Sequence, residues 1–183
     1  MSETRVSNRY AKSLIDLSKE RNSIDKVFGD IQAFKSALDA NLSLFNLMKS
    51  PIIDGDKKNK IISQIFSASF DTLTITFFET IIRKKREYYL YDIAQAFIGQ
   101  YYAMNQITTA KVTTAQELTE ANTQEIKSLI EKGTGKTVIL DSKVDPSLIG
   151  GLVVQIEDKL YDASISGKLR KAKQELLNTY ISK

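Results

Sequence analysis

The sequence predicts a mainly α fold: an N-terminal helical bundle over residues 1–105, then a smaller α+β domain over residues 106–183 with a short β-sheet and a C-terminal helix. In the first hundred residues, apolar side chains recur every three or four positions between breaks of turn chemistry. After Gln106 the composition shifts to β-branched residues and threonine, which favours strands. The chain has 183 residues, 42% of them hydrophobic, which is enough to bury the core of one ordinary domain or two small ones.

Three helices are expected before Pro51. The first covers about residues 4–21, and its apolar positions are Val6, Tyr10, Ala11, Leu14, Ile15 and Leu17. The second follows Asn22-Ser23 and carries Ile24, Val27, Phe28, Ile31, Phe34 and Leu38. The third is short and ends at Ser50, because the residue before a proline avoids helical geometry; its apolar residues are Leu42, Leu44, Phe45, Leu47 and Met48.

Three further helices are expected up to residue 105. Asp54 is a candidate N-cap for the fourth, which directs inward Ile61, Ile62, Ile65 and Phe66. The fifth starts at Asp71-Thr72. Its run "LTITF" alternates like a strand, but Leu73, Phe77 and Ile81 continue at i+4 spacing beyond strand length and favour a helix. The sixth, about 88–105, contains five of the eight tyrosines: Tyr88, Tyr89, Tyr91, Tyr101 and Tyr102.

The second part mixes strands and helices. We expect a half-buried strand at "ITTAKVTTA", a helix capped by Thr119 with Ile126, Leu129 and Ile130, and a strand at "TVIL". Asp145-Pro146 predicts a turn, and "GGLVVQI" and "KLYDA" predict two more strands. A final amphipathic helix over about 164–182 should pack on the sheet through Ile165, Leu169, Ala172, Leu176 and Tyr180.

Composition limits the chemistry. The chain has no cysteine and no histidine, which excludes disulfides, thiolate or imidazole catalysis and the usual zinc and copper ligand sets. The acidic pairs Asp54/Asp56 and Glu157/Asp158 lie in turn contexts typical of solvated acids. We therefore predict no catalytic residues, no cofactor and no metal. No apolar run could span a membrane and the N-terminus does not resemble a signal or transit peptide, so a soluble or peripheral protein is expected.

The run Gly133-Thr134-Gly135-Lys136-Thr137 looks like the end of a phosphate-binding loop. Such a loop needs a glycine five positions before the Gly-Lys pair and a helix after it. Ile130 occupies the first position, and the "VIL" that follows Thr137 favours a strand. We therefore interpret the run as a helix end, with Gly133 as a left-handed C-cap.

Basic segments raise the question of nucleic-acid binding. The run Arg83-Lys84-Lys85-Arg86 could bind nucleic acid or an anionic membrane, but cations at a helix C-terminus also complement its dipole. The last helix suits an acidic partner or a phosphate backbone through Lys168, Arg170, Lys171 and Lys173. The clustered tyrosines could stack bases, although tyrosines packed in a helix with their hydroxyls at the surface are the favoured interpretation. The net charge of +4 is only mildly basic.

Residues 144–169, "VDPSLIGGLVVQIEDKLYDASISGKL", resemble the C-terminal signature of the delta subunit of bacterial F-type ATP synthase, the family called oligomycin-sensitivity-conferring protein in mitochondria. The matching positions are Asp145, Leu148, Gly150, Gly151, Asp162, Ser164, Gly167 and Leu169. The "RYAKSL" of Arg9 to Leu14 resembles the Tyr-Ala-x-x-Leu of the family's first helix. The turn at Glu157-Asp158 departs from the family pattern because it lacks the usual glycine. Ala163 likewise replaces a glycine, and Ser166 an arginine.

The resemblance implies a noncatalytic stator subunit that links the catalytic head of ATP synthase to the peripheral stalk, so that proton flow is coupled to ATP synthesis. It implies a six-helix bundle that holds an N-terminal helix of the alpha subunit between its first and fifth helices, and a C-terminal domain that binds the b subunits of the peripheral stalk. The location would be the cytoplasmic face of the bacterial plasma (inner) membrane, with no nucleic-acid partner and only indirect membrane contact. The apolar residues available for the groove, which could equally be ordinary core, are Tyr10, Ala11, Leu14, Phe77, Phe78, Ile81 and Ile82.

Two alternative functions are open on the sequence alone. A basic nucleic-acid-binding module would bind with an affinity that falls steeply with salt. A small nucleotide-dependent enzyme would use the Gly-Thr-Gly-Lys-Thr run, and Lys136→Ala would abolish nucleotide binding or turnover.

Overall fold

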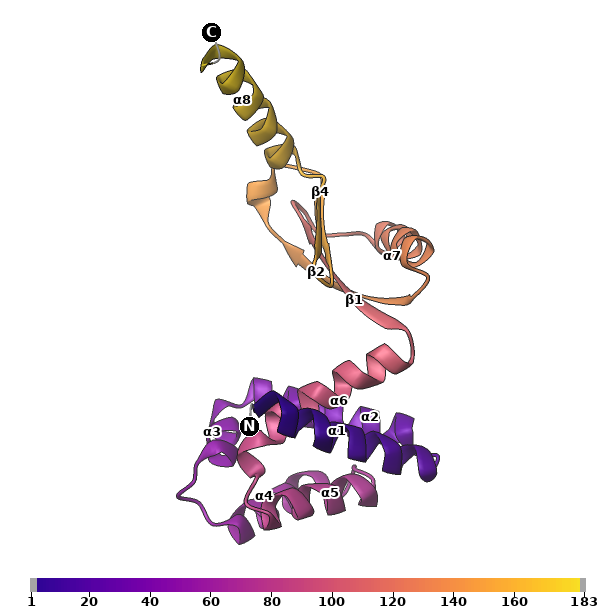
Figure 1. Ribbon diagram of the computed structural model, residues 1–183, viewed down its shortest axis with the longest axis vertical. Helices are drawn as coiled ribbons and strands as arrows, with labels where there is room; N and C mark the ends of the chain where they lie inside the picture. The colour runs from indigo at the N-terminus through magenta and orange to yellow at the C-terminus, as the bar shows by residue number, and fades with distance from the viewer. Residues whose placement is uncertain (1–2, 182–183) are drawn as a thin grey trace. The chain divides into compact units, whose positions relative to one another are not determined.

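The computed structural model describes residues 3–181. It forms two compact units, one ending at Met104 and the other beginning at Asn105. The first unit is helical, and the second combines a four-stranded sheet with helices (Figure 1). The predicted fold class, mainly α with a short sheet and a C-terminal helix, is confirmed.

The first unit contains the helices expected from the apolar periodicity. Their bounds are α1 (Glu3–Glu20), α2 (Ile24–Ala40), α3 (Leu42–Lys49), α4 (Gly55–Phe66), α5 (Thr72–Arg83) and α6 (Leu90–Met104). A single 3-10 turn, η1 (Glu87–Tyr89), precedes α6, so the tyrosine-rich segment begins as a tighter turn than expected. The segment "LTITF" is helical, as the i+4 spacing predicted.

The ends of these helices are set by short-range hydrogen bonds. Asp71 caps α5, because Leu73 N donates to its Oδ1 at 2.7 Å. Asp54 holds the N-cap position of α4 but makes no capping bond through its side chain. After α1 and α5 the chain turns through left-handed residues, Asn22 (φ 51°) and Lys85 (φ 55°). The amide after each closes a six-residue loop onto the helix, the Schellman arrangement that satisfies the last carbonyls.

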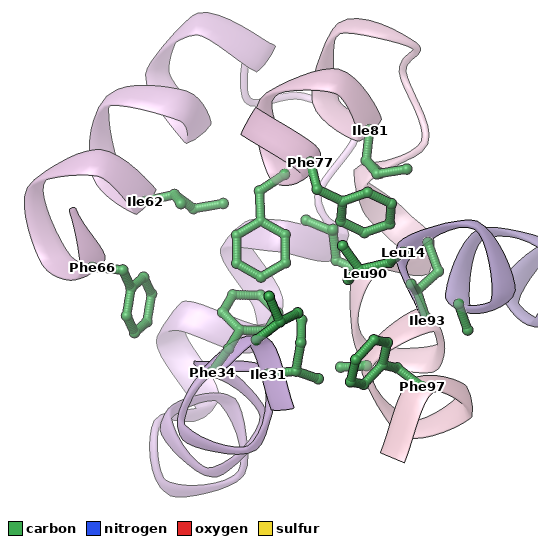
Figure 2. Packing of buried hydrophobic residues seen from close by; sticks show 14 of the residues in the cluster. Leu14, Ile31, Phe34, Ile62, Phe66, Phe77, Ile81, Leu90, Ile93 and Phe97 are labelled. Atoms are coloured by element: carbon green, nitrogen blue, oxygen red, sulfur yellow. The ribbon is translucent and has the colours of Figure 1, made fainter. Parts of the chain in front are cut away.

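The core of the bundle is one apolar cluster to which α1 to α6 all contribute. Phe34 of α2 lies at its centre, with its ring centroid 5.6 Å from that of Phe66 and 4.5 Å from that of Phe78. Ile81 of α5 and Phe97 of α6 close the cluster beside α1 (Figure 2). All five side chains are less than one tenth exposed. Burial on this scale makes the hydrophobic effect the main source of the bundle's stability.

The inward face of α1 differs from the expected stripe. Leu17 was expected to face inward but is 42% exposed. Ala11, Leu14 and Ile15 are buried as expected, and the remaining inward positions are Ser7 and Ser18, which continue the face at four-residue spacing from Ala11 and Leu14. Ser18 can be buried because its hydroxyl donates to the Ile15 carbonyl at 2.8 Å. These small side chains allow α1 to pack closely on α6, its main neighbour.

The inward face of α4 also departs from the prediction. Ile65 was expected to be inward but is 50% exposed, whereas Ile62 and Phe66 are buried as expected. The third buried position is Lys58, four residues before Ile62 on the same face. A charged residue therefore completes the stripe where the apolar pattern suggested Ile65.

The sheet of the second unit has the order β2-β1-β3-β4. Its strands are β1 (Ile107–Thr114), β2 (Thr137–Val144), β3 (Leu152–Ile156) and β4 (Lys159–Asp162). β1 and β2 are parallel, joined by α7 (Glu120–Thr134), and the other pairs are antiparallel. In Figure 1, α7 lies against one face of the sheet. The small core there is Ala110, Val112, Val138 and Val154, covered by Leu118, Ile126 and Ile130.

α7 begins as predicted and ends later than predicted. Thr119 caps it by accepting a hydrogen bond from Asn122 N at 3.2 Å. The left-handed C-cap is Gly135 (φ 68°), not Gly133, which lies inside the helix. The helix continues because Thr134 stays helical and its hydroxyl donates to the Ile130 carbonyl at 2.8 Å. Gly135 N then closes the helix on the Glu131 carbonyl.

The last helix, α8 (Ile165–Ile181), does not pack on the sheet, and that prediction is wrong. Ile165, Leu169 and Leu176 are 44, 57 and 64% exposed. Ala172 is also exposed, and the side chain of Tyr180 lies outside the described residues. The helix contacts η2 (Pro146–Leu148) and continues past the end of the sheet (Figure 1). Its direction is fixed at its N-terminus, by the contacts described below.

Candidate functional site

Six of the seven residues predicted to line a groove between α1 and α5 belong to the bundle core. These six, between 0 and 9% exposed, are Ala11, Leu14, Phe77, Phe78, Ile81 and Ile82. Tyr10 is half-buried and packs against the same cluster. The structure therefore brings all seven together, with six as support and Tyr10 nearest to solvent. On α1 the side chain of Leu17 is also apolar and is exposed, although the periodicity predicted that it would lie in the core.

The basic run after α5 divides into two parts. Arg86 is half-buried, and its Nη1 donates to the hydroxyl of Tyr10 in α1. Its guanidinium carbon also lies 5.6 Å from the centroid of the Tyr10 ring, within cation–π range. Arg83, Lys84 and Lys85 are exposed at the C-terminal end of α5. One cation of the run is thus structural, and the other three form a small surface patch that also complements the helix dipole.

The tyrosines of α6 are half-buried, and other side chains hold two of them in place. The Tyr101 ring stacks on Phe28, with centroids 4.0 Å apart, and its hydroxyl donates to Asp25 Oδ1 at 2.7 Å. That hydrogen bond raises the pKa of Tyr101. The Tyr91 hydroxyl donates to Asp39 Oδ1 at 2.9 Å. The Tyr91 ring packs against the core and the Tyr101 ring against Phe28, with both hydroxyls bonded to carboxylates, which agrees with the favoured interpretation rather than with a base-stacking platform.

Lys58 is a buried ionic centre that sequence reasoning missed. Its ammonium donates to the Met48 carbonyl at 3.1 Å, the Ser50 carbonyl at 2.7 Å and Glu87 Oε1 at 2.9 Å. Its side chain is 1% exposed, so the charge is compensated by these three acceptors. The contacts join α4 to the end of α3 and to η1. The available signal was its position four residues before Ile62, on the apolar face of the helix.

The Gly-Thr-Gly-Lys-Thr run is a helix end followed by β2. Lys136 lies half-buried, and its Nζ is 2.7 Å from Glu157 Oε1 in the β3–β4 turn. This contact lowers the pKa of Glu157. Glu157 has a φ of 52°, a left-handed conformation that glycine adopts more readily than a residue with a side chain. The lysine that suggested phosphate binding therefore stabilises a turn.

The predicted signature residues meet where the sheet passes into α8. The Ser164 amide and hydroxyl both donate to Asp162 Oδ1, at 2.9 and 2.6 Å. The same hydroxyl accepts from Gly167 N at 2.9 Å, so Ser164 is the N-cap of α8. A β-carbon on Gly167 would overlap the Asp162 carboxylate, which accounts for the glycine. The hydrogen bonds from Ser164 lower the pKa of Asp162.

The other half of the signature anchors the loop that contacts α8. Asp145 accepts from Ser147 N at 2.9 Å and starts η2, an arrangement that lowers its pKa. Gly150 O accepts from Ile165 N at 3.0 Å. Gly151 has a φ of 73°, and a β-carbon there would overlap the Ala163 carbonyl. Six signature residues thus form one junction that holds η2 against the start of α8. Of the remaining two, Leu148 is half-buried in η2 and Leu169 is exposed on α8.

The second unit leaves many apolar side chains in solvent. On α8 these are Ile165, Leu169, Leu176 and Leu177, between 44 and 64% exposed. Outside α8, Leu129, Ile149 and Leu160 are 63 to 65% exposed. Such density of exposed apolar residues on a small unit is typical of a protein interaction surface.

These features define a class of protein: a two-unit protein with a closed helical bundle and a small α+β unit that exposes many large apolar side chains, as binding proteins do. Among residues 3–181, no cluster of three acidic, histidine or cysteine side chains is suited to hold a metal ion. Within the same range, no helix has the length and apolar character needed to cross a membrane.

Residues 6–176 match the model of the family described as ATP synthase delta (OSCP) subunit, and the chain belongs to that family. ATP synthase subunit delta of Cytophaga hutchinsonii is 34% identical to it over 182 residues, covering the whole of both chains. ATP synthase subunit delta of Nitrobacter winogradskyi is 33% identical, covering 93% of this chain and 92% of its own length. A chain in the cryo-EM structure of the Toxoplasma gondii mitochondrial ATP synthase hexamer has the same fold, with a TM-score of 0.71 and 24% identity over 93% of this chain and 97% of its own.

Proposed function

We propose that this chain is a noncatalytic tie between the catalytic head and the peripheral stalk of an F-type ATP synthase. As a delta (OSCP) family member it is a component of the stator. The observation that carries the proposal is the family match across residues 6–176, together with the division of the chain into two units of contrasting surface. A tie needs two separate binding surfaces and no chemistry of its own, since it resists torque between the head and the turning rotor.

The bundle binds the N-terminal helix of the alpha subunit between α1 and α5. In support, Tyr10 is half-buried and Leu17 is 42% exposed, so α1 offers apolar contact to a partner helix. Behind them, Ala11 and Leu14 give a rigid floor. Binding of an amphipathic helix on such a surface follows the helix-in-groove mode.

The α+β unit binds the b subunits of the peripheral stalk. This proposal is supported by the exposed apolar side chains of α8 and α7. A partner that covers them would stabilise the complex by about 25 cal/mol for each Å² of apolar surface removed from water. The chain carries no catalytic role, consistent with a composition that lacks cysteine and histidine. It belongs to a membrane-associated complex, and it acts at the cytoplasmic face of the bacterial plasma (inner) membrane.

Affinity purification from the source organism tests this function. The full chain, tagged and expressed in place of the untagged copy, is recovered from detergent-solubilised membranes and its partners are identified by mass spectrometry. We expect the alpha and b subunits of ATP synthase in stoichiometric amounts. Recovery of the chain without either of them would contradict the proposal.

A pair of surface variants tests the proposed binding of the alpha subunit by the bundle. Leu17→Ser should weaken binding of a synthetic peptide of the alpha subunit N-terminus without lowering the melting temperature, because the side chain is already 42% exposed. Leu42→Ser, at a position 71% exposed on α3, is the matched control and should bind the peptide as the unaltered chain does. Equal binding by all three proteins would place the alpha subunit elsewhere.

A further inference from the structure

A groove crosses the second unit between α7 and the loop that precedes β3. It has a volume of about 600 Å³. One wall is the face of α7 that carries Asn122, Ile126 and Leu129, the other is the segment from Ile149 to Leu152, and the linker after β1 closes one end. None of the residues that the structure describes in α8 lines it.

Five large apolar side chains line the groove, among polar ones. Leu118, Ile126 and Leu152 are half-buried and pack on the small core of the sheet. Leu129 and Ile149 stand at its edges, 63 and 65% exposed. On α7 the apolar lining residues Ile126 and Leu129 are three positions apart on one face, which also carries the polar Asn122. Together with Leu118, Ile149 and Leu152 they form the apolar stripe of the groove. A helix laid along this stripe would cover all of these side chains.

Ile149 is held in a strained conformation. Its φ is 66° and its ψ is −37°, and a positive φ at a β-branched residue is an outlier. The loop is fixed there on both sides, because Ile149 N donates to the Pro146 carbonyl and Ile165 N donates to the Gly150 carbonyl. The fold thus maintains a strained backbone at a residue whose side chain gains almost nothing from burial. Strain of this kind concentrates at functional positions.

The ionisable side chains of the groove are all acidic. Glu117 and Glu125 line it, and no lysine or arginine does. Neither glutamate takes part in an ion pair among the described residues. An occupant that buries the apolar stripe must therefore bring positive charge beside these two carboxylates, since an acidic one would be repelled.

We propose that this groove binds a helix of the partner protein whose apolar stripe is flanked by lysine or arginine, with one apolar side chain packed between Leu129 and Ile149. The proposal rests on the proposed function, in that the partner is a b subunit of the peripheral stalk. It adds the place of binding and the chemistry of the bound segment: a basic amphipathic helix held by two glutamates and an apolar floor.

Calorimetric titration of the full chain with the soluble part of the b subunits of the same ATP synthase tests the proposal. Ile149→Gly should raise the melting temperature, because it relieves the positive φ, yet weaken binding about tenfold through the lost contact. A residue with a purely structural role would not separate stability from affinity in this direction. Glu117→Gln combined with Glu125→Gln should weaken binding about tenfold at low salt and flatten its salt dependence.

Asp141→Asn is the matched control for charge. Asp141 lies on β2, and strand alternation places it on the sheet face opposite Val138 and Leu140, which pack against α7. It should bind as the unaltered chain does. If the unaltered chain binds the b subunits and the groove variants bind equally well, the groove proposal is overturned and the proposed function stands. Loss of binding on Leu169→Ser and Leu176→Ser alone would also overturn it and place the partner on α8. If the unaltered chain does not bind the b subunits, the proposed function of this unit fails, and the groove proposal with it.

Discussion

The bundle and the α+β unit bury their apolar residues to very different degrees. The bundle holds a single cluster of twenty buried apolar residues, whereas the α+β unit buries four. Of the sixteen large apolar side chains exposed in the described part of the chain, ten lie in the second unit, although it is the smaller one. The comparison shows that the bundle encloses its apolar core and the α+β unit does not, and on the proposed function a partner completes the second unit.

The largest effect is expected from emptying the bundle core. Phe34→Ala should lower the free energy of unfolding of the bundle by about 4 kcal/mol, because it removes a ring that contacts Phe66 and Phe78. Val112→Ala, in the small core, should cost the second unit only about 1.5 kcal/mol. Hydrogen exchange by mass spectrometry measures the two units separately. An equal or larger loss from Val112→Ala would break the comparison.

The second-largest effect on stability is expected from removing the buried charge of Lys58. Lys58→Met leaves Glu87 and two carbonyls without their donor, and should cost the bundle about 3 kcal/mol in urea unfolding. Lys57→Met is the control, since Lys57 is exposed on the same helix. A double variant with Glu87→Leu should recover part of the loss. If the Lys58→Met variant were as stable as Lys57→Met, the hydrogen bonds from the Lys58 ammonium to Glu87 and the two carbonyls would not contribute to stability.

Two glycine substitutions compare the junction between η2 and α8 with the interior of a regular helix. Gly151→Ala should destabilise the second unit by about 1 kcal/mol or more, because φ is 73° and the new methyl meets the Ala163 carbonyl. Gly99→Ala, inside α6 with no neighbour within 4 Å of the added β-carbon, should stabilise the bundle by about 0.5–1 kcal/mol. Amide hydrogen exchange, measured separately for each unit, gives both changes in the free energy of unfolding. Opposite signs are the expected result, and a stabilising Gly151→Ala would contradict the junction geometry.

The smallest effect concerns pH: acid should weaken both units, since the hydrogen bond from Lys35 also lowers the pKa of Asp39 in the bundle, whereas the groups with raised pKa values among residues 3–181 all lie in the bundle. Asp145, Glu157 and Asp162 of the second unit have lowered pKa values, so the stability they contribute is present above about pH 4 and is lost as the pH falls through their folded-state pKa values. In the bundle, hydrogen bonds to Asp39 and Asp25 raise the pKa values of Lys35 and Tyr101. That contribution is present below about pH 10 and is lost as the pH rises through the folded-state values. Asp162→Asn should reduce the acid sensitivity of the second unit. Amide hydrogen exchange of that unit, measured between about pH 3 and 6, tests this. The same dependence of its stability on pH in the variant and the unaltered chain would contradict the expectation.

Periodicity was sufficient for most of the fold and much less informative about the surfaces. The i+4 spacing of Phe77 and Ile81 predicted α5 correctly, because the spacing of apolar residues reports which side of a helix is buried. It failed where a polar residue is buried with its own partners, as Ser18 and Lys58 are. It failed again for α8, because an apolar stripe indicates contact without indicating whether the contact is within the chain or with another protein.

The candidate sites were predicted to different extents. The signature residues from Asp145 to Gly167 were found by resemblance, and the structure supplies the reason for six of them: hydrogen bonds at Asp145, Gly150, Asp162 and Ser164, and the lack of room for a β-carbon at Gly151 and Gly167. The groove beside α7 could not be found from the sequence, since its two walls are about twenty residues apart and meet only in the fold. The strain at Ile149 is a backbone property that no residue pattern reveals.

The most direct test of the central claim is amide hydrogen exchange of this chain free and within the assembled ATP synthase. The account predicts that core amides of α2 and α6 exchange slowly in both states, while those of α7, η2 and α8 exchange rapidly in the free chain and become strongly protected in the complex. Equal protection of the second unit in the two states would contradict the claim that a partner completes it.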